Sequence, residues 1–183
     1  MTLSPIEQTK SWVSQVIVGY NFCPFAKKEV VNNTIEYVDS QTESHEDAVI
    51  EMLSLIQQMR ENDEIETCLH IFSKGFQNFD DFLDLVDLAN AMLVSSGYEG
   101  FIQIANFHPD YVFADSDESD AANYTNRAPY PTLHLIREAS MARVLDIHPD
   151  PEGIPETNIK LAREKGISFW QQLLNHCQTG KKD

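Results

Sequence analysis

Short segments rich in β-branched and aromatic residues alternate along this chain with segments whose apolar residues recur at helical spacing. The predicted strands are 34–39, 66–73, 100–107 and 132–136, and the longest predicted helices are 5–19, 45–60 and 79–96. Strand-helix-strand units close right-handed with the helix packed on the sheet, so we expect the first three strands to be parallel. The last strand follows a connection without helical periodicity and is expected to be antiparallel.

Shorter helices are predicted after Pro24, at 138–146 and at 155–175, the last broken at Gly166. The sequence therefore predicts an α+β fold: a single layer of about four mixed strands, three parallel and one antiparallel, packed with five or six helices. A length of 183 residues without repeats or a linker indicates a single domain, 1–183. We expect its core at about 5–175 and a frayed tail at 176–183.

The charge balance restricts the partners of the chain. Thirteen basic against 29 acidic residues give a net charge of −16, which repels nucleic acid and anionic membrane surfaces. No apolar run approaches the ~20 residues that span a bilayer, and the first ten residues lack signal-peptide features, so a cytoplasmic location is expected. Three widely spaced cysteines argue against a disulfide framework or a structural zinc cluster and favour a reducing compartment.

The long connection 107–131 is the first candidate for a functional site. It leaves the third strand at the sheet edge where open sheets bind ligands, and it far exceeds the median loop of ~4–6 residues. The ligand-binding candidates are Tyr111, Asn123, Asn126, Arg127 and Tyr130. Arg127 is an isolated cation whose planar fork suits a carboxylate or phosphate, which predicts an anionic small molecule as ligand. Alternatively, Arg127 pairs with an acidic residue of the same loop and the aromatic residues pack the loop down.

Two histidines are candidates for proton transfer, because imidazole titrates near physiological pH. His108 opens the long loop, and His134 lies in the fourth strand. His134 alternates with Leu133 and Leu135, so its side chain should point to the opposite face of the sheet. It could equally be a core histidine with its hydrogen bonds satisfied.

Cys23 is the third catalytic candidate. Placed at the N-cap of a helix that begins at Pro24, with Lys27 and Lys28 one turn along, its thiolate would be stabilised and could act as a nucleophile. The alternative is a buried cysteine that behaves as a small apolar residue.

The spacing of the candidate ligands does not demand a metal site, and no cofactor is indicated. Cys23, His108 and His134 could ligate a soft or borderline metal ion only in principle. The acidic run 115–120 lacks the spacing and glycine of an EF-hand loop, so we interpret it as a solvated turn.

Three stretches resemble the motifs of the bacterial family called domain of unknown function 1415, which has relatives in plants. They are NFCPFAKK at 21–28, FHPDYVFAD at 107–115 and NYTNRAPYPTLHLIRE at 123–138, and the resemblance extends over nearly the whole chain. It implies a shared fold and a shared site, and its recurring polar set is Cys23, His108, Asn126, Arg127 and His134. One composite site is the corresponding hypothesis.

Shorter likenesses suggest a redox alternative. The segment CPFA resembles the active-site motif of omega-class glutathione transferases, and YPTLHLI resembles the proline-threonine strand of thioredoxin-like proteins. In those folds a strand leads directly into the cysteine turn, whereas here an amphipathic helix precedes Cys23.

Three functions are therefore open at this point. The first is an enzyme or binding protein for an anionic small molecule, with a His/Arg/Asn pocket in 107–134, with or without Cys23. The second is a thiol-redox or glutathione-linked protein that uses Cys23. The third is a non-catalytic protein-interaction module that uses the acidic surface.

Overall fold

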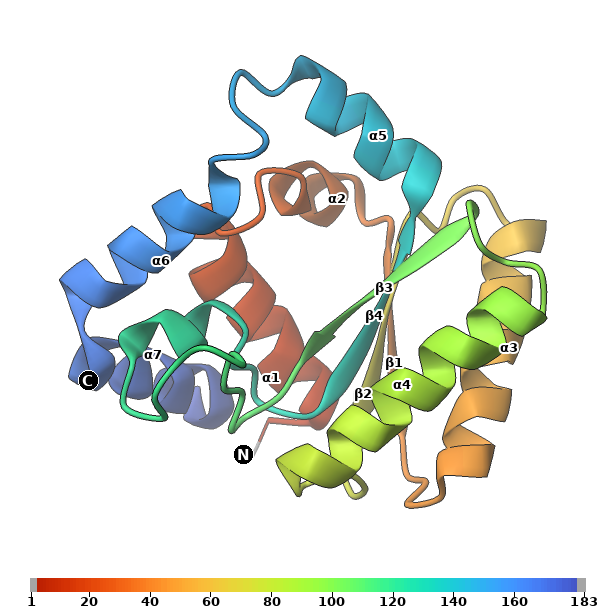
Figure 1. Cartoon of the computed structure of the whole chain (residues 1–183), viewed down its shortest axis with the longest axis horizontal. Coiled ribbons are helices and arrows are strands. Elements are labelled where there is room, and N and C mark those ends of the chain that lie inside the picture. Colours follow the sequence, from red (N-terminus) through yellow and green to blue (C-terminus); the bar gives the residue numbers. More distant parts are fainter. Residues whose placement is uncertain (1–2, 181–183) are drawn as a thin grey trace.

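The computed structural model describes residues 3–180 and combines one four-stranded sheet with seven α-helices in that range (Figure 1). The strands are β1 Ile35–Ser40, β2 Thr67–Phe72, β3 Ile102–Phe107 and β4 Thr132–Arg137. The helices are α1 Pro5–Trp12, α2 Ala26–Asn32, α3 His45–Glu61, α4 Phe79–Ser95, α5 Glu138–Ile147, α6 Ile154–Lys165 and α7 Ile167–Thr179. A π-helical stretch, η1 Val13–Val18, continues α1, and a 3₁₀ turn, η2 Ala121–Thr125, lies in the long connection.

Side-chain caps fix the starts of the predicted long helices. Ser4 forms a capping box with Glu7, and the side chains of Ser44 and Asn78 accept the backbone N–H groups that open α3 and α4. The second helix differs from the prediction, because α2 begins at Ala26 with Phe25 at its N-cap. Cys23 therefore precedes that helix instead of capping it.

The sheet order is β1-β2-β4-β3, which corrects the predicted arrangement of three parallel strands. Only β1 and β2 form a parallel pair, and β4 pairs antiparallel with both β2 and β3. The prediction of three parallel strands is wrong in its pairing. The strand β3 runs in the same direction as β1 and β2, but it pairs with β4 and not with β2. The connections fix the direction in which each strand runs, whereas the neighbour of a strand depends on long-range pairing. The connection after β3 is long enough for β4 to return into the slot between β2 and β3.

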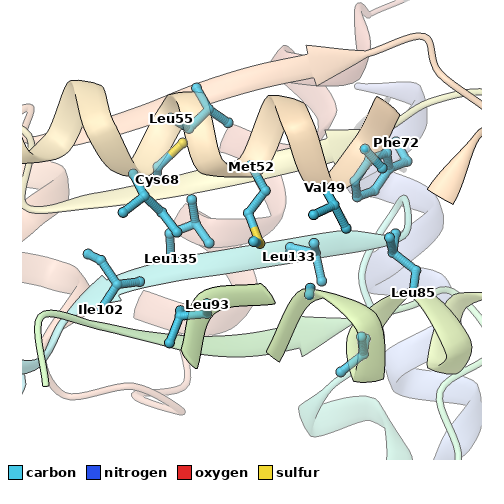
Figure 2. Close-up of a cluster of buried hydrophobic side chains, with 14 of the residues drawn as sticks. Val49, Met52, Leu55, Cys68, Phe72, Leu85, Leu93, Ile102, Leu133 and Leu135 are labelled. Atoms are coloured by element: carbon cyan, nitrogen blue, oxygen red, sulfur yellow. The ribbon is translucent and has the colours of Figure 1, made fainter. Parts of the chain in front are cut away.

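One face of the sheet, which we call the closed face, is covered by α3 and α4 (Figure 1). Its core consists of apolar side chains from these two helices and from the alternate positions of β2, β3 and β4. Figure 2 shows Met52 of α3 packed toward Leu133 and Leu135 of β4. All three residues are inaccessible to solvent. Close packing on this face leaves these side chains no freedom to serve another purpose.

The other face, which we call the open face, carries α1, α2, α5, α6 and α7 (Figure 1). Trp12 and Trp170 lie in the centre of its core, and each is only 1% exposed to solvent. The helices α2 and α5 have no fully buried residue, in contrast to α3 and α4. These helices therefore enclose space instead of packing directly on the sheet.

The carboxyl-terminal helix extends further than predicted. The frayed tail was expected from residue 176, yet α7 continues to Thr179 and Cys177 is fully buried. Residues 181–183 lie outside the described part of the chain. No helix among the described residues is both long enough and apolar enough to span a bilayer.

Candidate functional site

A cavity of about 390 Å³ lies between the open face and its covering helices. Its floor is formed by strand residues such as Leu69, Ala105 and His134, and its walls come from α1, η1, α2, α5 and α6. The strand residues that line it include the first residues of β1 and β2, Ile35 and Thr67. The sequence placed a pocket at the other ends of these strands, below the 107–131 loop. That loop contributes only part of one wall.

The lining of the cavity is overwhelmingly apolar. Trp12, Phe107 and Phe113 supply aromatic surface, while Met141 and Val144 of α5 form another part of the wall. The polar lining residues are Glu29, Glu66, Thr67, Thr125, Asn126, His134, Ser140 and Asn158. Ligand sites in proteins commonly combine such an apolar wall with a few placed polar groups.

His134 is the central polar group of the floor. As its alternation with Leu133 and Leu135 predicted, its ring points away from their closed-face core and lines the open-face cavity. The ring nitrogen Nε2 lies 2.6 Å from Oγ1 of Thr67, and that hydroxyl lies 2.7 Å from the carbonyl oxygen of Leu135. When the hydroxyl donates to Leu135, its oxygen is left to accept a hydrogen bond from Nε2. This arrangement favours the tautomer of His134 with the proton on Nε2.

The second ring nitrogen of His134 is left free. Nδ1 has no hydrogen-bond partner among residues 3–180, and unlike Nδ1 of His70 it is not sealed from solvent. Burial lowers the pKa of His134 to about 4, so the ring is neutral at pH 7. Nδ1 consequently presents an uncharged lone pair that can accept a hydrogen bond.

The charged residues at the cavity are carboxylates. Glu66 accepts a hydrogen bond from Ser140 of α5, and Glu29 accepts one from Thr34. Within the described chain, no lysine or arginine lines the cavity. An anion placed there would meet negative charge without a compensating cation.

Cys23 lines the same cavity as His134, so the structure brings these two predicted residues together. The backbone N–H groups of Phe25 and Ala26 lower the pKa of its thiol, but burial has the larger effect and raises the pKa above its ordinary value. The stabilised thiolate expected from the sequence is therefore not supported. The cysteine is half-buried and forms no disulfide.

Asn126 is the third predicted site residue at the cavity. Its side-chain nitrogen donates to the backbone oxygen of Asn106, 3.3 Å away, and its oxygen accepts from Thr125. The backbone oxygen of Asn126 accepts the N–H of His108. These bonds tie the end of the long loop to β3, so Asn126 forms a fixed part of the wall.

His108 lies elsewhere, on the closed-face side of the loop, and is not part of the cavity. Its ring packs between Phe79 and Phe82 of α4, with centroid separations of 5.0 and 5.2 Å. Nε2 lies 3.0 Å from the backbone oxygen of Phe76, and Nδ1 accepts the backbone N–H of Asp110 at 3.0 Å. Both nitrogens are occupied and the residue is fully buried, with a pKa lowered by burial. The geometry gives His108 a structural position.

Arg127 also lies away from the cavity and holds the loop together. Its guanidinium donates to the backbone oxygens of Tyr111 and Glu118 and stacks on the ring of Tyr124 at 4.7 Å. The arrangement is close to the alternative hypothesis, in which Arg127 binds partners within its own loop. Those partners are backbone carbonyl groups and an aromatic ring instead of a carboxylate.

The remaining predicted ligand-binding residues stabilise the same loop or its neighbours. Asn123 is fully buried, accepts the N–H of Phe113 and donates to the backbone oxygen of Asp117. Burial raises the pKa of Tyr111, and Tyr130 donates its hydroxyl to Gln8 of α1. None of the three lines the cavity.

The acidic run 115–120 lies in turns and is mostly exposed, and two of its carboxylates have partners within the chain. Asp120 caps η2 and pairs with Arg163 of α6 at 2.7 Å, an ion pair that lowers the pKa of Asp120 to about 2. Asp117 accepts both the backbone N–H and the hydroxyl of Ser119. No group of three or more His, Cys, Asp or Glu side chains with the geometry of a metal site occurs among residues 3–180.

The proposed composite site is therefore divided between two places. Cys23, Asn126 and His134 meet at the cavity, whereas His108 and Arg127 brace the long loop. Sequence reasoning missed Thr67 and Glu66 and the role of Trp12. Thr67 has the same strand alternation as Leu69 and could have been assigned to the open face, but its contact with His134 required the pairing of β2 with β4.

Trp12 contributes to the cavity wall a buried N–H group without a hydrogen-bond partner among the described residues. The residue is 1% exposed, and its indole Nε1 has no hydrogen-bond partner among the described residues. Its ring stands edge-on to Phe107, 5.0 Å away, in the row of rings that leads to His134. Buried polar groups without a partner are rare in folded proteins.

Comparison with curated proteins and with solved structures finds no match. One family model matches residues 4–172, from the cap of α1 into α7. The match includes every element of the cavity and of the braced loop. The chain therefore belongs to the family described as protein of unknown function DUF1415.

Proposed function

We propose that this chain binds a small, predominantly apolar molecule in the open-face cavity. The observation that carries the proposal is an apolar cavity of about 390 Å³ with one neutral imidazole on its floor. Apolar side chains in folded domains normally pack against one another, so an apolar space of this size between the sheet and its covering helices needs a reason. A bound molecule would supply the missing contacts.

The local backbone supports the same proposal. The first helix changes from α to π geometry at Val13, and η1 then contributes Val13 and Ile17 to the cavity wall. Single π-helical turns cost hydrogen-bond geometry and are frequent at functional sites. Here the turn widens the helix at the place where it borders the cavity.

The charge of the lining argues for a neutral ligand instead of the anion expected from Arg127. Glu29 and Glu66 line the cavity, and Arg127 does not. The thiol-redox alternative also receives no support, because burial raises the pKa of Cys23. Binding of a neutral molecule is the function that the geometry favours.

A fluorescence titration tests the proposal. N-phenyl-1-naphthylamine is neutral and apolar and becomes brighter when it leaves water. We expect saturable binding of one probe per chain, lost in Ala105→Phe, whose new ring would fill the cavity floor. Ala91→Phe is the matched control, because Ala91 is exposed on α4 at the closed face. Absence of saturable binding to the wild type, or equal loss in both variants, would refute the proposal.

A further inference from the structure

We infer that the cavity selects apolar molecules that carry a neutral hydrogen-bond donor, a hydroxyl or N–H group, which donates to Nδ1 of His134. This inference rests on the proposed function and names the chemical class of its ligand. Its argument depends on the hydrogen-bond relay beneath the ring, on the charge of the cavity and on the surroundings of the imidazole.

The relay decides which kind of group the imidazole can recognise. Thr67 donates to the carbonyl oxygen of Leu135 and accepts from Nε2 of His134, with distances of 2.7 and 2.6 Å. While the hydroxyl keeps its bond to Leu135, the other tautomer, with its proton on Nδ1, would leave two acceptors facing each other at Nε2 and Thr67. The relay therefore favours the tautomer in which Nδ1 is an acceptor, and an acceptor binds a donor.

The ring is also prevented from acting as a cation. It is enclosed by Phe107, whose centroid lies 6.0 Å away, and by the apolar cavity wall. The cavity contains no basic side chain from the described chain that could compensate an anion, and it contains Glu29 and Glu66. A carboxylate ligand would lose its hydration and gain no cation, so carboxylates should be rejected.

A pure hydrocarbon should bind more weakly than a molecule with the donor. Filling the cavity with an apolar group would remove Nδ1 from water without replacing its hydrogen bond, and such an unpaired acceptor is costly in a dry site. Sites built around a buried hydrogen bond discriminate strongly against analogues that lack the matching group. We therefore expect the preference for a donor-bearing ligand to come from the hydrogen bond to Nδ1 of His134, which a hydrocarbon cannot form.

Three ligands of similar shape test this inference by competition with N-phenyl-1-naphthylamine. 2-Naphthol carries the donor, 2-fluoronaphthalene replaces the hydroxyl by a near-isosteric fluorine, and 2-naphthoate carries a negative charge. We expect 2-naphthol to compete about tenfold more tightly than 2-fluoronaphthalene, which corresponds to one hydrogen bond. 2-Naphthoate should compete more weakly than both.

Variants assign the preference to the relay. In His134→Leu the advantage of 2-naphthol should vanish while 2-fluoronaphthalene still binds. Thr67→Val removes the acceptor of Nε2 and should weaken the preference, whereas Thr67→Ser keeps the hydroxyl and should preserve it. If the wild type bound the two neutral ligands equally, preferred 2-naphthoate, or kept its preference in His134→Leu, the inference would be overturned although the cavity still binds the probe. If the probe itself did not bind, the proposed function would fail and the inference with it.

Discussion

Both faces of the sheet carry apolar side chains, but these side chains are packed differently on the two faces. On the closed face, α3 and α4 pack fully buried apolar side chains onto β2 and β4, and Figure 2 shows Met52 beside Leu133. On the open face, α2 and α5 have no fully buried residue and border a cavity. The closed face therefore supplies stability, and the open face has room for a ligand.

Two histidines sharpen this comparison. His108 has both ring nitrogens bonded to backbone groups, whereas His134 has one nitrogen bonded and one free at the cavity. Burial lowers the pKa of both rings, so a shifted pKa alone does not separate a structural histidine from a candidate functional one. The number of hydrogen-bonding atoms left unused separates them.

The largest expected effect compares two methionines. Met52→Ala on the closed face should lower the free energy of unfolding by about 2–5 kcal/mol, because it leaves a void in a close-packed core. Met141→Ala on the cavity wall should cost less than about 1 kcal/mol, because one side of that side chain already faces open space. Urea denaturation of both variants measures the difference. Equal costs would show that the two faces are packed alike.

The next effect is the response to acid. His134 has a pKa of about 4 in the folded protein against an ordinary value of 6.5, so the unfolded chain binds the proton first as the pH falls. Stability is thus fully present above pH 6.5 and is lost between pH 6.5 and 4, by at most roughly 3 kcal/mol from this group. His134→Leu should lose that much less stability than the wild type over this range in urea titrations at stepped pH. Identical acid sensitivity of the two proteins would contradict the burial of this ring.

Replacement of the structural histidine should act on stability alone. His108→Leu leaves the Phe76 carbonyl and the Asp110 N–H without their partner and should cost about 2 kcal/mol. Affinity for N-phenyl-1-naphthylamine should remain within a factor of two or so of the wild type, since His108 does not line the cavity. Thermal denaturation and the probe titration give the two readouts. Loss of probe binding in a stably folded His108→Leu variant would show that His108 takes part in ligand binding.

Arg127 should have a smaller effect of the same kind. Arg127→Met removes the bonds to Tyr111 and Glu118 but keeps an apolar stem beside Tyr124, so we expect a loss of about 1 kcal/mol. Ligand competition by 2-naphthoate should not change. An affinity for anions in the wild type that disappears in this variant would restore the anion-binding role predicted from the sequence.

The smallest effect concerns Cys23. Because burial raises the pKa of its thiol, iodoacetamide should label Cys23 at pH 7 more slowly than it labels free cysteine. Bound N-phenyl-1-naphthylamine should slow the reaction further, since Cys23 lines the cavity. Mass spectrometry of the labelled peptide follows the rate. Labelling faster than that of free cysteine would favour the redox function.

The sequence was most informative where structure is local. Apolar residues at helical spacing located the three long helices, and strand alternation assigned His134 to the correct face. Pairing between distant segments could not be obtained this way. The insertion of β4 between β2 and β3 is a long-range choice, and it is what places Thr67 beside His134.

The candidate site was predicted in part for the same reason. The long loop is rich in polar residues, but Asn123 and Arg127 use their hydrogen-bonding groups on the loop's own backbone. Composition alone does not show whether a polar side chain is used by the fold or is free for a ligand. The cavity itself is formed by apolar residues of several helices, which look like ordinary core positions in the sequence.

Nitrogen-15 NMR of histidine-labelled protein tests the central claim most directly, because it reports the protonation of each imidazole nitrogen. At pH 7, Nδ1 of His134 should give the signal of an unprotonated nitrogen, and the hydrogen bond from 2-naphthol should shift that signal while Nε2 stays protonated. The signals of His108 should stay unchanged. A protonated Nδ1 in His134, or a response to 2-naphthol at His108 alone, would contradict the account.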